Sequence, residues 1–313
     1  MLITGVTGFI GSSLASRLVE MGYKVYGLVR HTSSGRNVPS GVMKVFGDLT
    51  DYHSLVSVVR SVRPEVVFHV GALTPVSLSY DQPRVYAEVN YLGTVNLLEA
   101  LRRHSHESLV LVAVAGTTEM YNTPYKIRNG IPFRPESPYA ISKVASVLYA
   151  EYVYRAYNMP TVVVIPTNTY GRAFVRQHHF FIEKLIVNML LGKRRIELGS
   201  PDCVRDWMFR EDHVDAYIRI LQTIMSNKDG VIGNRFYFGT GVGYTTRDTA
   251  KVVSEVVGWR GELVWNAFQR PSETMKIVVD YTKSSEVLGW EPKWNLRDGV
   301  RKAVEEWREV LGL

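Results

Sequence analysis

The feature that most constrains the fold of this chain is a glycine-rich stretch near its N-terminus, TGVTGFIG at residues 4–11. It follows a short apolar segment typical of a buried strand, and an amphipathic helix pattern continues from it over 11–21. Gly5 and Gly8 let backbone N–H groups approach a pyrophosphate, and Gly11 lets the helix pack against the strand. The helix N-terminus adds positive partial charge. The stretch therefore predicts a dinucleotide-binding loop; the alternative is a glycine-rich turn without a ligand.

Apolar segments and helix patterns alternate through the first half of the chain. The segments with strand character are 1–4, 24–29, 42–46, 65–70, 108–115 and 161–165. The helix patterns between them begin at 11–21 and continue with a helix capped by Asp51 and ended by Pro64, then 84–103 and 138–157. Strand–helix–strand units place helices on both faces of a sheet, so they predict a Rossmann-like, doubly wound parallel α/β sheet.

The regular alternation of strand and helix patterns ends after residue 167. Helix patterns at 180–191, 214–225, 246–257 and 297–311 mix with loops rich in Gly, Pro and Trp. One further strand near 235–239 is expected to return to the sheet. We therefore predict a dinucleotide-binding domain over 1–167, with that strand added, and a smaller, interleaved α/β substrate domain over 168–313.

Composition and charge exclude several classes of protein. The single cysteine excludes an intrachain disulfide framework and a cysteine-based zinc cluster. Apolar runs are much shorter than the ~18 residues of a membrane-spanning helix, and the sequence starts directly in a strand pattern, so a cytoplasmic protein without a membrane partner is expected. Lys and Arg number 37 against 30 Asp and Glu but are scattered, so no nucleic-acid partner is predicted. No metal site is predicted, because adjacent His178 and His179 diverge and no third ligand is evident.

The end of the second predicted strand bears on the cofactor. Sites for NAD usually carry Asp or Glu there, which binds the ribose hydroxyl groups. This chain has Arg30 instead, and a guanidinium suits a 2′-phosphate. We therefore predict NADP; the alternative is that Arg30 stacks on the adenine of NAD.

A tyrosine and a lysine lie near the start of the helix predicted over 138–157. Tyr139 and Lys143 are four residues apart and share one helix face. A nearby ammonium and a nicotinamide cation both favour phenolate, so the pKa of Tyr139 is expected to be lowered toward use as a base. Such pairs are also common on solvated surfaces. The fifth strand ends at GTTEMY, residues 116–121, and ligands bind at the carboxyl ends of strands in such sheets, so this end should face the nicotinamide.

With these features, the chain resembles the extended short-chain dehydrogenase/reductase family of nucleotide-sugar epimerases and dehydratases. The resemblance covers essentially the whole chain. Besides the glycine loop and the Tyr139/Lys143 pair, it rests on GDL (47–49), HVGA (69–72), VNYLGT (89–94), NTYG (168–171), VRDW (204–207) and RPSE (270–273). It implies NAD(P)-dependent chemistry on a nucleotide-diphosphate sugar.

The resemblance assigns catalytic roles. Thr117 would hydrogen-bond the sugar O4, and Tyr139, beside Lys143, would remove its proton while C4 gives hydride to the nicotinamide. The 4,6-dehydratases carry glutamate two residues after the hydroxyl residue, and this chain has Glu119 there. A carboxylate at that point can remove the C5 proton that a 4-ketone acidifies; water then leaves from C6, and hydride returns to C6. A 4,6-dehydratase is implied; a 4-epimerase and an NADPH-dependent 4-keto-sugar reductase are the alternatives, and a structural role for Glu119 also stays open.

The resemblance also bears on the sugar nucleotide. Many dehydratases have Asp immediately before the glutamate, whereas this chain has Thr118. GDP-mannose 4,6-dehydratases have a small hydroxyl residue there, an arginine resembling Arg30 and a stretch resembling residues 270–273. A GDP-mannose-like substrate is therefore favoured, although the chain is short for those enzymes and has Asn122 where they usually have Gly.

Binding residues follow from the same resemblance. Asn168, Arg205 and Arg270 would hold the diphosphate and nucleoside, with Thr118 also binding substrate, and the segment 171–176 either lines the same cleft or is a solvated loop. Asp48 and Leu49 would contact adenine; the alternative there is a helix cap supplied by Asp51. The full set implied for the cofactor is Gly5, Gly8, Phe9, Ile10, Gly11, Arg30, Asp48, Leu49, Gly71, Ala72, Tyr139 and Lys143.

A homodimer is also implied. Relatives pair the helices that match 84–103 and 138–157 with the same helices of a second copy. Val144, Val147, Leu148 and Tyr152 serve either that interface or the core.

Overall fold

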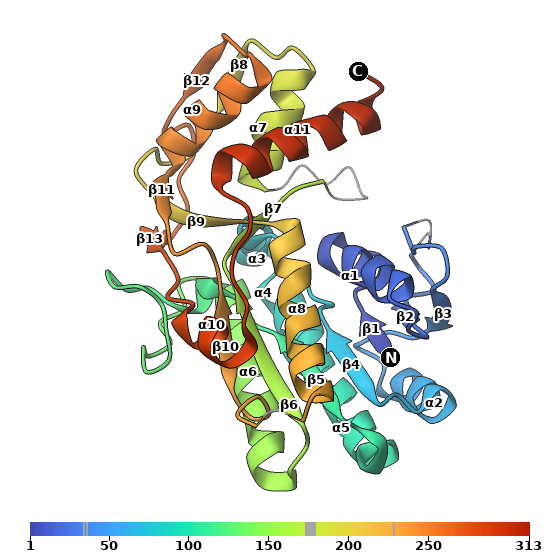
Figure 1. Cartoon of the computed structure of the whole chain (residues 1–313). Helices are drawn as coiled ribbons and strands as arrows, with labels where there is room; N and C mark the ends of the chain where they lie inside the picture. The colour runs from blue at the N-terminus through green and yellow to red at the C-terminus, as the bar shows by residue number, and fades with distance from the viewer. Residues whose placement is uncertain (34, 36, 173–179, 228) are drawn as a thin grey trace.

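The computed structural model describes residues 1–313 except 34, 36, 173–179 and 228. Figure 1 shows a larger lobe, built around one sheet, which contains the N-terminus. A smaller lobe above it contains the C-terminus and is formed by short strands and three helices, α7 (Phe181–Leu190), α9 (Thr246–Val257) and α11 (Leu296–Leu311).

The larger lobe contains a seven-stranded sheet in which every neighbouring pair is parallel. Its strands are β1 (Leu2–Thr4), β2 (Tyr26–Val29), β3 (Met43–Phe46), β4 (Val66–His69), β5 (Leu111–Ala115), β6 (Thr161–Pro166) and β10 (Arg235–Phe238), in the order β10-β6-β5-β4-β1-β2-β3. This confirms the predicted Rossmann-like fold, including the late strand, which pairs with β6. The strand order reverses between β1 and β4, the point at which such sheets bind ligands.

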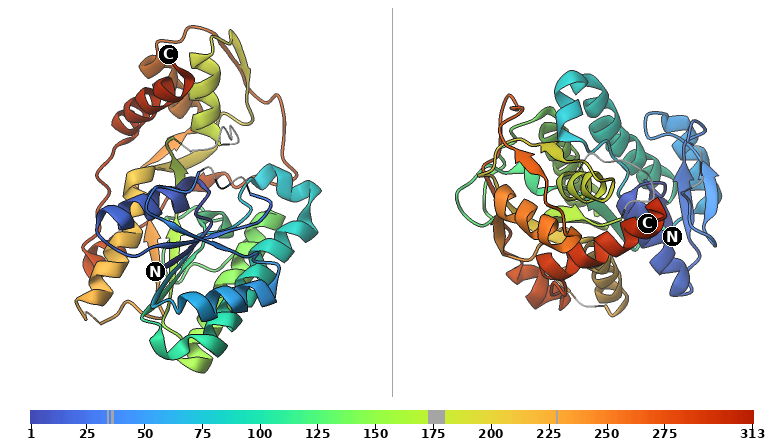
Figure 2. Two further views of the ribbon diagram at one scale, coloured as in Figure 1. Left: turned by 90° about the vertical axis from the view of Figure 1, so that its right-hand side faces the viewer. Right: turned by 90° about the horizontal axis from the view of Figure 1, so that it is seen from above.

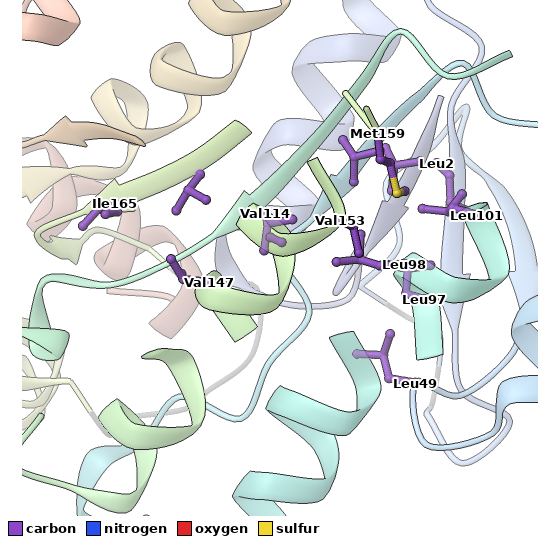
Figure 3. Close-up of a cluster of buried hydrophobic side chains, with 14 of the residues drawn as sticks. Leu2, Leu49, Leu97, Leu98, Leu101, Val114, Val147, Val153, Met159 and Ile165 are labelled. Atoms are coloured by element: carbon purple, nitrogen blue, oxygen red, sulfur yellow. The ribbon is translucent and has the colours of Figure 1, made fainter. Parts of the chain in front are cut away.

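Helices cover both faces of this sheet, as Figure 2 shows. One face carries α2 (Tyr52–Val62), α5 (Gly93–His104) and α6 (Pro138–Tyr157), and the other carries α1 (Phe9–Glu20) and α8 (Arg210–Met225). Figure 3 shows part of the core on the first face, where Leu98 and Val147 belong to one buried cluster with Val114 of β5. Burial from both sides explains why β5 is apolar throughout.

The helix predicted over 84–103 is not a single α-helix. It consists of α4 (Pro83–Tyr86), a π-helical segment η1 (Ala87–Leu92) and then α5. Within η1 the Asn90 side chain accepts from the Leu73 N–H and donates to the Leu73 carbonyl, at 2.8 and 3.0 Å. The Asn90 carbonyl accepts from Thr94 Oγ1 and Ser146 Oγ, at 2.6 and 2.8 Å. Wide turns of this kind are frequent at functional sites, and the contacts that accompany this one are invisible to sequence periodicity.

The smaller lobe has short strands that the sequence did not predict. One sheet contains β7 (Asn168–Tyr170), β9 (Val204–Phe209), β11 (Gly243–Thr245) and β13 (Lys276–Ile277), and a second pairs β8 (Arg195–Glu197) with β12 (Glu262–Val264). Apart from β9, these strands have two or three residues and are too short to show a clear alternation of apolar residues. The expected boundary after residue 167 falls between β6 and β7, which lie in different sheets, but the division into two domains stays a prediction.

The remaining short helices lie between these elements. They are α3 (Val76–Asp81), η2 (His106–Ser108), η3 (Thr118–Met120) and α10 (Thr282–Leu288). Across the described ranges, no helix is both long and apolar enough to cross a membrane.

The buried carboxylate of Asp206, in β9, ties the two lobes together. Its Oδ1 accepts from the N–H and the hydroxyl of Thr240, and its Oδ2 accepts from the N–H groups of Gly241 and Val279. Its backbone carbonyl accepts from Thr167 Oγ1 at 2.9 Å. Thr167 directly follows β6, and Thr240 lies just beyond the end of β10, so this residue fixes the ends of two neighbouring strands of the large sheet.

A second buried acid, Glu183 in the first turn of α7, carries a pH dependence. Its Oε1 accepts from the Gly171 N–H at 3.0 Å, whereas Oε2 has no hydrogen-bond partner in the part of the chain that the structure describes. Burial raises the pKa of Glu183 to about 8. The carboxyl group is therefore protonated in the folded protein at neutral pH.

We predict that Glu183→Gln makes stability less dependent on pH. The folded pKa of about 8 lies above the ordinary 4.5, so between these values the native state holds a proton that the unfolded chain releases. The free energy of unfolding should fall as pH rises through this window, by at most ~1.4 kcal/mol per pH unit, and glutamine should remove that component. Urea unfolding of the wild type and the variant at several pH values tests this. The contributions of the other buried acids are the same in both proteins and cancel in the difference between the two unfolding free energies. Parallel pH profiles would contradict it.

Candidate active site

The glycine-rich loop between β1 and α1 is packed backbone against backbone. Gly5 has a φ of +71°, and a Cβ on it would lie 2.7 Å from the Gly71 Cα. A Cβ on Gly11 would lie 2.2 Å from the Gly5 carbonyl oxygen. Gly8 is the N-cap of α1, and its N–H donates to the Gly5 carbonyl at 2.9 Å. Because no side chain caps this end of the helix, its first N–H groups can bind a phosphate, so the loop fits a dinucleotide.

The structure brings other predicted cofactor residues to the same edge of the sheet. Phe9 and Ile10 form the first turn of α1, Gly71 and Ala72 lie just beyond the end of β4, and Arg30 directly follows β2 with an exposed side chain. All of them lie at the carboxyl edge, because the strands are parallel.

Asp48 and Leu49 follow the next strand, β3. Asp48 Oδ1 accepts from the N–H and hydroxyl of Thr50, at 2.9 and 2.8 Å. Asp51 caps α2, as predicted, by accepting from the N–H groups of its second and third residues. The cap belongs to Asp51, and the adenine contact of Asp48 and Leu49 stays a prediction.

Tyr139 and Lys143 lie one turn apart near the start of α6, and both side chains are buried. The hydroxyl of Ser137 caps this helix. Thr117, between β5 and η3, hydrogen-bonds Tyr139 and also accepts from the Glu119 N–H at 3.3 Å. The structure thus places Thr117 beside the pair, and the burial of the pair excludes a solvated surface.

Without a bound nicotinamide, the pKa of Tyr139 is raised and not lowered; the expected lowering, which includes the charge of the nicotinamide, stays a prediction. Burial raises the pKa well above its ordinary range; the hydrogen bond with Thr117 offsets only part of this, and the charge of Glu119 raises it further. Burial also lowers the pKa of Lys143 to about 8. Removing the phenolate from water outweighs the nearby lysine, so a lowered pKa requires the positive charge of a bound ligand.

Glu119 lies in η3, just beyond the end of β5, with a partly exposed side chain. Its charge acts on the hydroxyl groups of Tyr139 and Tyr80. Within the described residues its carboxylate makes no hydrogen bond, so it does not cap a turn. The neighbouring Thr118 is almost completely buried, at 1% exposure, and its contact with substrate stays a prediction.

His69, to which the sequence analysis gave no role, lies at the centre of a buried hydrogen-bond chain. Its Nδ1 is 2.8 Å from Thr4 Oγ1, which accepts from the Gly71 N–H, and its Nε2 is 2.9 Å from Thr94 Oγ1. Because the Thr94 hydroxyl donates to the Asn90 carbonyl, it must accept from Nε2–H, and Nδ1 is then the acceptor for Thr4. Burial lowers the pKa of His69 to about 3, consistent with this neutral form.

The chain of hydrogen bonds continues to the helix that carries Tyr139. The Asn90 Nδ2 also donates to Ser142 Oγ at 3.0 Å, next to Lys143. One polar network therefore connects the glycine loop, the π-helical segment and the start of α6. The sequence signal for it was the pair of motifs HVGA and VNYLGT, which place polar residues inside otherwise apolar elements.

Arg205 and Arg270 meet at a carboxylate that the sequence analysis had not assigned. Glu273 Oε1 accepts from Arg205 Nη2 at 2.8 Å and from Arg270 Nη1 at 3.3 Å. The Arg205 side chain is nearly buried, whereas that of Arg270 is 34% exposed. Asn168 begins β7, and its buried Oδ1 has no partner among the described residues. Two adjacent guanidinium groups and an unsatisfied amide oxygen suit a nucleoside diphosphate.

Two predictions fall on residues that the structure does not describe. Of the segment 171–176, only Gly171 and Arg172 are described, and the His178/His179 pair lies outside the described residues.

Comparisons with known proteins agree over almost the whole chain. Residues 2–303 match the family model described as GDP-mannose 4,6 dehydratase. UDP-glucose 4-epimerase of Mycolicibacterium smegmatis is 33% identical, over 98% of each chain. GDP-mannose 4,6 dehydratase 1 of Arabidopsis thaliana is 30% identical, over 99% of this chain and 90% of that one. The crystal structure of Thermus thermophilus UDP-glucose 4-epimerase in complex with NAD is 29% identical, covers 98% of both chains and has a TM-score of 0.86.

We predict that Gly11→Ala weakens dinucleotide binding. The new methyl group would lie 2.2 Å from the Gly5 carbonyl oxygen, so the loop must shift, at a cost of about 1–3 kcal/mol or roughly 5- to 150-fold in dissociation constant. Calorimetric titration with NADP and NAD measures this. Glu20→Ala, exposed in the last turn of α1, is the control and should bind normally. Unchanged affinity in Gly11→Ala would contradict the loop assignment.

Proposed function

Since this chain belongs to the GDP-mannose 4,6 dehydratase family of extended short-chain dehydrogenase/reductases, we propose that it is an NAD(P)-dependent nucleotide-sugar 4,6-dehydratase with a GDP-mannose-like substrate. The observation that carries the proposal is Glu119, a partly exposed carboxylate whose charge reaches the hydroxyl of Tyr139. Relatives named as GDP-mannose dehydratases, similar over 96–99% of this chain, support it.

Oxidation at C4 is assigned to the residues beside α6. A bound nicotinamide supplies the hydride acceptor and, later, the hydride donor. Tyr139 takes the proton of the O4 hydroxyl, and Thr117, which hydrogen-bonds Tyr139, orients that hydroxyl. Lys143, one turn along the helix, stabilises the phenolate.

Elimination is assigned to Glu119. The ketone at C4 acidifies the C5–H; the carboxylate of Glu119 removes that proton and passes it to the hydroxide that leaves C6, which departs as water, and the proton that Tyr139 took from O4 is then available for C5. Hydride adds to C6 and a proton returns to C5, so the product is a 4-keto-6-deoxy sugar. Because the Glu119 carboxylate makes no hydrogen bond within the described chain, it is free to act as this base.

A 4-epimerase is the second candidate. It is favoured by the 33% identity to the Mycolicibacterium smegmatis enzyme named UDP-glucose 4-epimerase. An epimerase needs only the C4 steps, so it gives Glu119 no proton to remove. A 4-keto-sugar reductase would consume one NADPH per turnover, whereas the other two recycle the cofactor.

The nucleotide end of the substrate is assigned to Arg205, Arg270 and Asn168. Two guanidinium groups would replace their shared contact with Glu273 by contacts with two phosphates, each charge-assisted. The unpaired Asn168 Oδ1 can accept from a donor on the substrate. Thr118 is proposed as a further contact with the sugar.

NADP is the proposed cofactor because of Arg30. The residue is exposed directly after β2, where a ribose phosphate would be stabilised by a guanidinium. A solved relative was crystallised with NAD, so the preference between the two dinucleotides is a property to be measured in this chain.

We also propose that the protein is a homodimer and, from its sequence, cytoplasmic. Leu148 and Tyr152 are exposed on α6 and Leu92 is exposed on η1, whereas Val147 is core and Val144 is partly buried against that core. The exposed residues form the apolar surface that a second copy would cover.

We predict that Glu119→Gln blocks elimination and spares oxidation. Removal of a general base costs on the order of 10²-fold or more in turnover. With GDP-mannose, UDP-glucose and dTDP-glucose as trial substrates, NMR should show a C6 methyl product from the wild type only, and the variant should accumulate reduced nicotinamide with the accepted sugar. Glu107→Gln, exposed in η2, is the matched control. A product inverted at C4, made equally well by Glu119→Gln, would assign the epimerase instead.

We predict that Arg30→Ala weakens NADP binding and leaves NAD binding largely intact. Loss of a charged hydrogen bond of ~1.5–3 kcal/mol corresponds to roughly 10- to 100-fold in the NADP dissociation constant. Arg60→Ala, on the exposed side of α2, should change neither constant. An unchanged ratio of the two affinities in Arg30→Ala would remove the 2′-phosphate argument.

A further inference from the structure

We propose that Tyr80, Glu136 and Ser272 form a clasp that positions the Arg270-bearing segment over the catalytic edge of the sheet and thereby sets the affinity for the nucleoside diphosphate. These three residues come from three separate parts of the chain: α3, the loop before α6 and the loop between β12 and β13. The inference rests on the proposed role of Arg270 and Arg205 as diphosphate ligands.

Glu136 is the centre of the clasp. Its Oε2 accepts from Ser272 Oγ at 2.7 Å, its Oε1 accepts from Asn122 Nδ2 at 2.8 Å, and Arg134 Nε lies 3.4 Å from Oε1. The hydrogen bonds from Asn122 and Ser272 hold the pKa of Glu136 below its ordinary range. The carboxylate is therefore ionised and accepts a charge-assisted hydrogen bond from the Ser272 hydroxyl.

Tyr80 closes the clasp from the other side. Its hydroxyl lies 3.1 Å from both the Glu136 carbonyl and the Ser272 carbonyl, so one donor is shared between the two segments. The charges of Arg270, Glu273 and Glu119 all act on this hydroxyl. The Tyr80 hydroxyl is therefore within electrostatic range of both Glu119 and the proposed diphosphate ligand Arg270.

The segment held by the clasp is attached through its side chains, which include Phe268 under the Lys184 ammonium group and the buried Thr274. From 268 to 274, the described backbone makes no hydrogen bond with another backbone group; the nearest such bonds involve Ala267 N–H and the Met275 carbonyl. Its links to the larger lobe are the bonds of Ser272 to Tyr80 and Glu136, and its link to β9 is Glu273 to Arg205. Arg270 is two residues from Ser272, so its position depends on these bonds.

The third contact of Glu136 comes from Asn122, just after η3. Its Nδ2 donates to Glu136 Oε1 at 2.8 Å. This bond holds one carboxylate oxygen of Glu136, and the other oxygen accepts from Ser272.

The test is calorimetric titration of the full-length protein, with dinucleotide bound, using GDP, UDP and dTDP as probes. Ser272→Ala and Tyr80→Phe should each weaken binding of the preferred probe by about 3- to 10-fold, because each removes a hydrogen bond in a partly exposed site. Ser272→Thr keeps the hydroxyl and should restore wild-type affinity. In turnover assays the two weakening variants should raise KM and leave kcat unchanged.

Two controls separate the clasp from general stability and from the proposed function. Ser285→Ala removes a hydrogen bond of the same kind at an exposed position, from Ser285 Oγ in α10 to the carboxylate of Glu291, and this variant should bind the probe normally. Melting temperatures and dinucleotide affinity should not change in any clasp variant. Arg270→Ala tests the diphosphate site itself and should weaken the probe strongly. If Arg270→Ala weakens the probe but Ser272→Ala and Tyr80→Phe do not, the clasp is refuted and the diphosphate site stands. If Arg270→Ala binds like the wild type, the assignment of Arg270 fails and the clasp fails with it.

Discussion

The contact that the rest of the structure depends on is the approach of three glycine backbones, Gly5, Gly11 and Gly71. Any side chain at Gly5 or Gly11 would overlap main-chain atoms, so α1 starts directly against the end of β1, and β4 lies directly beside it. This contact aims the first turn of α1 along the carboxyl edge of the sheet, where phosphate binds. The residues proposed as catalytic lie at that same edge because β5 and α6 carry them there.

A buried polar network transmits this geometry to the reacting groups. Successive hydrogen bonds connect Thr4, at the end of β1, through His69 and Thr94 to Asn90 in the π-helical segment. Asn90 in turn donates to Ser142, beside Lys143. For the hydroxyl groups of Thr4 and Thr94 and both ring nitrogens of His69, only one assignment of donors and acceptors is possible. A fully satisfied network of this kind in a low-dielectric interior is rigid, so the cofactor loop and the tyrosine helix are held in one relative position.

Much of this could be predicted, because the signals are local. The glycine loop, the Asp51 cap, the parallel strands and the Tyr139/Lys143 spacing each occupy a few consecutive residues. What was missed depends on distant partners. The π-helical turn accompanies the contacts of Asn90 with Leu73 and Ser146, and the pairing of Arg205 with Arg270 needs Glu273. The burial that raises the pKa of Tyr139 in the protein without ligand is likewise invisible to the spacing of Tyr139 and Lys143.

Interleaving of the two lobes has a consequence for synthesis of the protein. In the described chain the outer edge of β6 is covered by β10, and the segment between these strands builds β7, α7, β8 and β9 of the smaller lobe, including Asp206, and then α8 of the larger lobe. While the ribosome is still making residues 167–234, that edge and its apolar neighbours have no partner, a state prone to association with other nascent chains. The protein therefore completes its nucleotide-binding sheet late in translation, and truncated products ending before β10 should require chaperones to stay in solution.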